Sequence, residues 1–184
     1  MAMAFDEWGL DLEKDVQIVE GLARDSMWEA LRRSELAAFA STPPLNVHAE
    51  VEGYPVLLNF EQRLIPFQLG GLAARRSFIE ANPGAIARFL AAEVDSIKRF
   101  RADPVLGQSH TSRNLNNAET SRRTYEIFRR QQTPTLEPTV ESMEGVVTEL
   151  VKVRPEAARL RAQEMVEPRF INDLVAAGAL PLAD

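Results

Sequence analysis

The chain has 184 residues, a formal net charge of −6 and no cysteine. This length suits one domain or two small lobes, and the ordinary shares of hydrophobic (45%) and charged (26%) residues exclude a disordered or collagen-like chain. Without cysteine, the chain forms no disulfide, zinc–thiolate site or cysteine nucleophile. The negative charge argues against nucleic acid as a partner, because binding phosphates requires a basic surface.

The first seventy residues alternate short apolar runs with helical patterns. Residues 16–19 predict a short strand, and residues 25–34 carry the apolar spacing of an amphipathic helix. An uncharged run at 36–40 predicts a second strand, residues 45–52 a helix, and residues 56–58 a third strand. This order is typical of βαβ crossovers, so we expect an α/β fold with a small, mainly parallel sheet and flanking helices.

After residue 71 the apolar period is helical almost throughout. The clearest pattern runs over 82–103, and the spacing predicts further helices over 118–130, 139–153, 155–165 and 170–177, with a loop over 108–117. We therefore expect a helix-rich carboxyl-terminal half, and a division of the chain into residues 1–70 and 71–184.

The sequence offers no membrane span or signal peptide. The longest uncharged apolar run, residues 65–74, has ten residues, whereas a bilayer requires about 20. The first residues lack the basic and apolar regions of a secretion signal. A chain made as given is therefore expected to be cytoplasmic.

Four segments in collinear order carry a resemblance to a known family: "GLDLEKDVQIV", "LAAFASTPPLNVHAEVEGYPVL", "GGLAARRSFIEANPGAIARFLAAEVDSIKRFRADP" and "TPTLEPTVESMEGVVTELV". Together they resemble substrate-binding proteins of ABC importers, of the nitrate, sulfonate, taurine and thiamine-precursor type. The resemblance implies two α/β lobes with a small solute, anionic or heteroaromatic, bound in the cleft between them. It also implies an ABC permease as partner of the intact protein, an extracytoplasmic location, and no catalysis or cofactor.

The resemblance covers only the carboxyl-terminal portion of such a binder. Residues 1–70 would be most of the second lobe, and residues 71–184 the return strand and helices of the first lobe. We therefore expect a truncated solute-binding protein that binds its solute weakly or not at all by itself.

Two short segments supply the candidate ligand-binding residues. Ser41, Thr42 and Pro43 follow a predicted strand and precede a predicted helix, which is where open α/β sheets bind anionic ligands. The alternative for this segment is a helix cap followed by a rigid proline turn. Gln68 and Gly70 precede the return strand, where the resemblance places them facing the cleft; the alternative is hinge geometry.

Two other functions remain open. His48 and His110 are the only histidines, and their spacing predicts no metal site. His48 is expected to be an exposed helix residue, but either histidine could serve as the general base of a hydrolase-like enzyme. The other alternative is a self-associating interaction module with a homodimer as its form, because a truncated lobe leaves strand edges and apolar helix faces uncovered.

Overall fold

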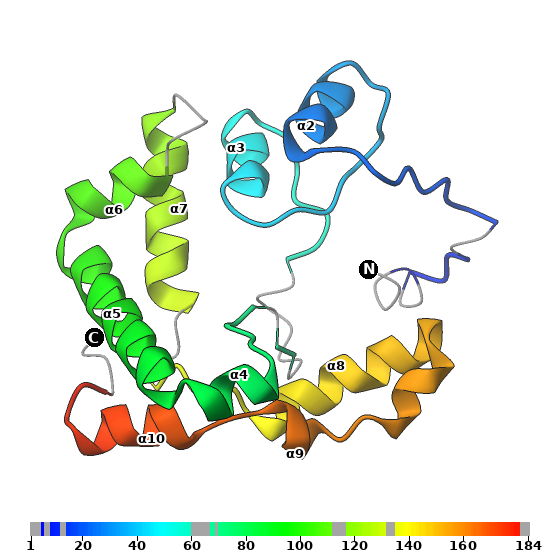
Figure 1. The fold of residues 1–184 in the computed structure, drawn as a ribbon. Helices are drawn as coiled ribbons and strands as arrows, with labels where there is room; N and C mark the ends of the chain where they lie inside the picture. The colour runs from blue at the N-terminus through cyan, green and yellow to red at the C-terminus, as the bar shows by residue number, and fades with distance from the viewer. Residues whose placement is uncertain are drawn as a thin grey trace. The chain divides into compact units, whose positions relative to one another are not determined.

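The computed structural model of the chain describes residues 5, 8–11, 14–59, 67–68, 70–111, 117–131 and 135–180. Within these residues every regular element is a helix, and no strand is present (Figure 1). The predicted α/β fold with a small parallel sheet is therefore wrong for the described part of the chain. The helices are α2 (Arg24–Arg32), α3 (Leu45–Val51), α4 (Arg76–Ala81), α5 (Pro83–Ala102), α6 (Pro104–Thr111), α7 (Ala118–Gln131), α8 (Val140–Val153), the 3₁₀ helix η2 (Pro155–Arg159), α9 (Ala162–Met165) and α10 (Arg169–Ala176).

The three predicted strands are irregular segments. In the run at 16–19, Ile18 and Val19 are about half exposed. Residues 36–40 and 56–58 are also non-helical and unpaired in a sheet, and so are residues 71–75, where the return strand was expected. A β-forming run becomes a strand only when another strand satisfies its backbone groups and covers one of its faces. No such neighbour exists among the described residues.

The predicted helices are confirmed in most cases. The patterns over 25–34, 45–52, 82–103, 118–130 and 139–153 correspond to α2, α3, α5, α7 and α8 with ends shifted by no more than two residues. The predicted loop over 108–117 is partly wrong, because α6 continues to Thr111. Its residues 112–116 lie outside the described part of the chain.

The structure divides the chain into two compact units that interleave along the sequence. The first unit comprises Met1–Phe60 and Val105–Phe128, and the second comprises Glu61–Pro104 and Arg129–Asp184. Neither unit corresponds to a single continuous segment. The expected division at residue 70 into two lobes stays a prediction.

In the first unit, α2 and α3 pack together and α7 contacts α3 through its side chains. The short helix α3 buries Leu45, Val47 and Ala49, and α2 buries Ala30. The buried residues of α7 are largely polar: Thr120, Ser121, Thr124 and Tyr125. The interior of this unit is therefore small and combines aliphatic with hydroxyl groups.

In the second unit, the core lies between α5 and α10. Val94 of α5 packs with Ile171 and Leu180, and Ile97, Leu136 and Leu174 surround them. Pro83 opens α5 at its first turn, where the missing amide proton has no cost. The amphipathic stripe of α5 therefore meets that of α10, and the buried apolar cluster of this unit lies between them.

Candidate functional site

The predicted ligand residues Ser41, Thr42 and Pro43 lie in an irregular segment before α3. The Ser41 hydroxyl donates to the carbonyl of Thr42 at 3.3 Å, and the Thr42 hydroxyl accepts from the Arg24 guanidinium at 3.1 Å. The N-cap of α3 is Pro44, which makes no side-chain cap. The strand end that was to create an anion site at this position is therefore absent, and neither hydroxyl caps the helix.

Gln68 and Gly70 lie in the second unit. The backbone amide of Gln68 donates to the carbonyl of Ser142 at 3.2 Å, and its side-chain amide donates to the carbonyl of Gly70. The first contact holds Gln68 against α8, and the second is local. Because Ser41 and Thr42 belong to the first unit, neither unit by itself contains the predicted set of five residues.

His48 is half-buried, so the prediction of an exposed helix residue is wrong. Its Nδ1 lies 3.3 Å from the Thr120 hydroxyl, and its ring meets Trp28 edge to face with centroids 5.0 Å apart. Trp28 meets Tyr54 in the same way at 5.4 Å. These contacts join α2, α3 and α7, so His48 has a clear structural role.

A hydrolytic role for either histidine lacks support in this geometry. Thr120, the hydroxyl nearest to His48, is only 1% exposed, so it does not reach a substrate. His110 is exposed on α6. Among the described residues, no group of three or more His, Asp or Glu is placed to hold a metal ion.

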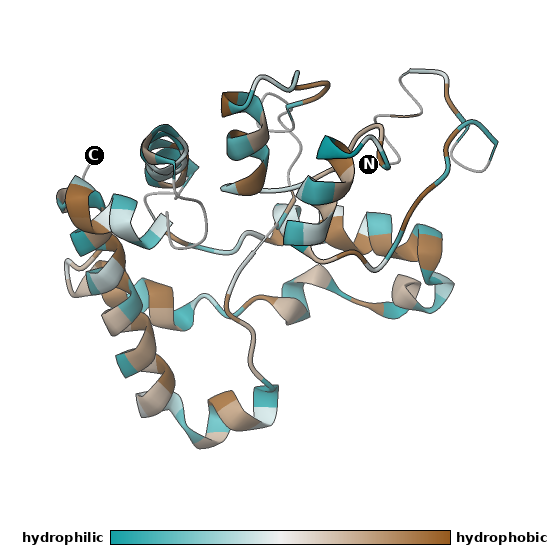
Figure 2. Ribbon diagram, turned by 90° about the horizontal axis from the view of Figure 1, so that it is seen from above, coloured by the Kyte–Doolittle hydropathy of each residue, from teal (hydrophilic) through white to brown (hydrophobic). Residues whose placement is uncertain are grey.

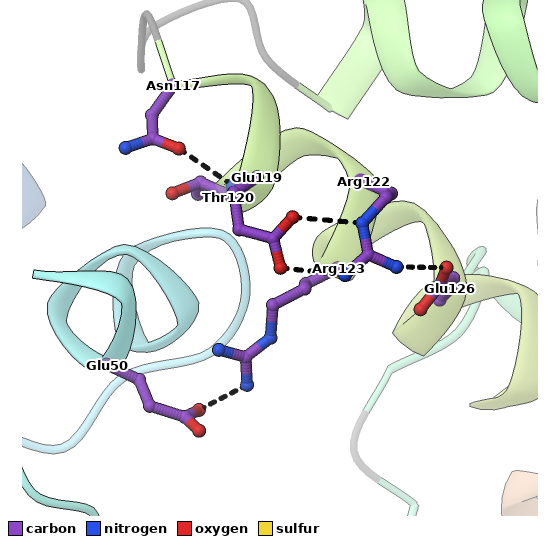
Figure 3. A network of polar contacts seen from close by, with 7 residues as sticks. All are labelled: Glu50, Asn117, Glu119, Thr120, Arg122, Arg123 and Glu126. Carbon is purple, nitrogen blue, oxygen red and sulfur yellow. Dashed lines mark hydrogen bonds and ion pairs between the residues drawn. The ribbon is translucent and has the colours of Figure 1, made fainter.

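The first turns of α7 carry a polar network (Figure 3). The Asn117 side chain accepts from the amide of Thr120 at 3.0 Å, which caps the helix start. Arg122 binds Glu119 and Glu126, each at 2.7 Å, across one helical turn. The Arg122 hydrogen bond lowers the pKa of Glu119, and the two carboxylates raise the pKa of Arg122. All these side chains are used within the helix, so the network is structural.

In the first unit, Arg123 joins α7 to α3. Its guanidinium lies 2.7 Å from the Glu50 carboxylate of α3 (Figure 3). Arg76 has a similar role in the second unit, where it binds Glu167 at 3.0 Å and the Glu164 carbonyl at 2.7 Å. The guanidinium groups of Arg76, Arg122 and Arg123 are thus engaged by the chain itself.

Helix α8 is only partly covered, because most of its apolar side chains are half-buried and two are exposed. This 14-residue helix has no buried residue, although η2 and α9 pack against it. At 100° per residue, its apolar side chains occupy one continuous arc of about 160°. We call this arc the α8 apolar face; it consists of Val140, Met143, Val146, Val147, Leu150, Val151 and Val153.

No charged residue interrupts the α8 apolar face. Leu150 is 36% exposed and Val153 72% exposed, and Glu144 at the edge of the arc accepts a bond from Gln163 of α9. The hydropathy view (Figure 2) shows apolar stretches recurring along the described helices. The sequence predicted the helical period of α8, whereas the exposure of Leu150 and Val153 depends on tertiary packing.

Other described helices and segments also expose large apolar side chains. Phe78 and Phe89 are at least half exposed in the second unit, and Val105 is 80% exposed in the first. These side chains mark surface that another molecule could cover.

None of the described helices combines the length and the apolar character needed to cross a bilayer.

Comparison with known proteins identifies no relative of this chain. No protein-family model matches the chain, and neither the curated proteins nor the solved structures include a significant match. The functional argument therefore depends on the chain's own residues.

Proposed function

We propose that this chain is a non-catalytic interaction module that self-associates through apolar helix surface. The observation that carries the proposal is the exposure of large apolar side chains on several described helices: Phe89 on α5 is 55% exposed, Val105 on α6 80% and Val153 on α8 72%. In water such side chains favour association, because covering them removes hydrocarbon from solvent.

The other predicted functions have less support. Solute binding as a truncated importer component stays a prediction, but the strand ends that were to form its site are absent from the described residues. A histidine-dependent hydrolase stays an alternative without a nucleophile within reach of His48, since Thr120 is buried. Self-association requires neither a sheet nor a catalytic group.

Sedimentation velocity of the purified chain over a hundredfold range of concentration tests the proposal. We expect the weight-average mass to rise from 20.6 kDa toward twice that value. A mass that stays at one chain up to the highest concentration overturns the proposal. A parallel calorimetric titration with a sulfonate should release no heat of binding; tight binding would favour the solute-binding hypothesis instead.

A further inference from the structure

We infer that residues 16–20 form a docking strand, which adds to the open edge of a β-sheet on a basic partner protein. The partner is defined by its chemistry: an unpaired strand edge with lysine or arginine side chains beside it. This surface is separate from the exposed helix side chains that carry the proposed self-association. Its failure would therefore leave that proposal intact.

The backbone of the docking strand is unpaired. Residues 16–20 run as an open, non-helical trace before α2 (Figure 1). Their amides and carbonyls make no hydrogen bond to the part of the chain that the structure describes. None of them has a positive φ, and Gly21, with a φ of +79°, ends the run. The backbone thus offers free donors and acceptors, which are the groups that strand addition uses.

The side chains of the docking strand suit a sheet. Val16, Ile18 and Val19 are β-branched, and such side chains fit a pleated surface. Ile18 is 52% exposed and Val19 is 50% exposed. In a strand, successive side chains point to opposite faces, so these two residues would add hydrocarbon contact on both faces of the partner's sheet.

Charge identifies the partner as basic. The first 30 residues hold eight acidic and two basic side chains, a net charge of −6. Since the whole chain has 27 acidic and 21 basic side chains, the remainder holds 19 of each and is neutral. Asp15 and Glu20, both exposed, lie at the two ends of the apolar run. Two such acidic strands repel one another, whereas a basic edge attracts one.

The run at residues 56–58 provides a comparison within the same unit. Val56 is 55% exposed and Leu57 is 66% exposed, so this run is at least as accessible. It has only three residues, follows Pro55, and has no acidic residue at either end. Strand addition by a basic edge therefore favours residues 16–20 over residues 56–58.

A synthetic β-hairpin is the probe for this surface. Its two strands alternate lysine with valine around an Asn-Gly turn, so it offers open basic edges. Fluorescence anisotropy of the labelled hairpin, at a concentration where it is monomeric by itself, follows its titration with the full chain. We expect saturable binding to the chain and none by a hairpin with glutamate in place of lysine. Absence of saturable binding to the lysine hairpin overturns the inference.

Proline substitution separates strand pairing from simple charge attraction. Ile18→Pro removes a central amide and leaves the charge unchanged, so it should weaken hairpin binding about tenfold or more. The matched control Leu57→Pro makes the same change on the comparison run and should bind like the parent. Binding that is insensitive to Ile18→Pro but disappears at about 1 M salt is non-specific charge attraction and overturns the inference.

Neutralising the ends of the strand tests the charge argument. The double change Asp15→Asn with Glu20→Gln should weaken binding several-fold at about 0.05 M salt, and less at about 1 M, where the screening length is roughly 3 Å. Equal affinity of parent and double variant at low salt would overturn the choice of a basic partner.

Hydrogen exchange of the unaltered chain gives a measurement that does not depend on any variant folding. Amides without a partner exchange quickly, and pairing slows them. The hairpin should therefore protect amides within residues 16–20 and leave those of residues 56–58 unchanged. Protection elsewhere but not within residues 16–20 overturns the docking strand.

Sedimentation of the same variants separates this surface from the proposed self-association. Ile18→Pro should leave the mass of the chain unchanged at every concentration, and its helical circular dichroism should equal that of the parent. Loss of self-association in this variant, with the helices retained, would show that copies pair through residues 16–20 and would overturn the assignment of a basic partner.

Discussion

Thr120 and Thr124 lie one turn apart on α7, and both are almost completely buried, yet their hydroxyls have different surroundings. The Thr120 hydroxyl contacts Nδ1 of His48 at 3.3 Å. The Thr124 hydroxyl has no hydrogen-bond partner in the described part of the chain and is 0% exposed. A buried polar group without a partner reduces stability, whereas one with a partner contributes to it.

Valine substitutions separate these two cases. Thr124→Val keeps the shape and removes an unpaired hydroxyl, so we expect it to raise the free energy of unfolding by about 1 kcal/mol. Thr120→Val leaves His48 without its partner and should lower the free energy of unfolding by about 1–2 kcal/mol. Urea denaturation of both variants gives the comparison. Equal effects of the same sign would contradict this assignment of the two hydroxyls.

Glu119 gives the residue-scale pH prediction. The Arg122 hydrogen bond holds the pKa of Glu119 below its ordinary value of 4.5. A lowered folded-state pKa means that the unfolded chain binds the proton first. The stabilising contribution is therefore complete above pH 4.5 and is lost as the pH falls through the lowered pKa.

Replacing Glu119 with glutamine should remove this part of the acid sensitivity. We expect the unfolding midpoint of Glu119→Gln to fall less than that of the parent between neutral pH and the region below 4.5. Thermal unfolding followed by circular dichroism measures both curves. Because the side chain is exposed, the difference will be small, and parallel curves would show that the ion pair contributes nothing to folding.

At the scale of elements, the packing of α5 against α10 sets the stability of the second unit. Val94 is 2% exposed in contact with Ile171 and Leu180. We expect Val94→Ala to lower the free energy of unfolding by about 1–3 kcal/mol, through lost burial and the cavity left behind. The control is Val153→Ala on α8, a side chain 72% exposed, measured at a concentration where the chain is monomeric. It should change stability by less than about 0.5 kcal/mol.

Helices such as α5 and α8 could be predicted closely because their hydrogen bonds are local. The three- and four-residue spacing of Ile86, Leu90, Val94 and Ile97 suffices to define a helix and its inner face. The run at 16–19 has β-forming residues, but a strand requires partners that are distant in sequence. The importer resemblance also implied a sheet. Because that sheet depends on pairing between distant segments, short β-forming runs alone do not produce it, and the described residues contain none.

At the scale of the whole molecule, net charge predicts how association responds to salt. Each chain carries a formal charge of −6, so two chains repel one another at low ionic strength. Raising the salt from about 0.01 M to about 1 M shortens the screening length from roughly 30 Å to roughly 3 Å. Dimerisation through an apolar contact should therefore strengthen with salt in sedimentation experiments. Weakening with salt would indicate a contact made mainly of ion pairs.

The candidate site was less predictable than the helices. Ser41 and Thr42 were selected because a strand was expected before them, and Gln68 and Gly70 because a strand was expected after them. Without those strands the residues lie in two different units. Thr42 accepts from Arg24 and the Gln68 amide donates to Ser142, while the other contacts of Ser41 and Gln68 are to carbonyls close in sequence. His48 was expected to be exposed, but its burial depends on Trp28 and on Thr120, which is 72 residues away.

The sequence by itself determined where the long helices lie, which face of each is apolar, and the absence of disulfide chemistry, because these follow from local spacing and residue type. Only the tertiary structure decided which apolar faces are covered. Val94 of α5 is buried against α10, whereas Val153 at the end of α8 stays exposed. Burial depends on which segments meet in space, and that is a property of the folded chain as a whole.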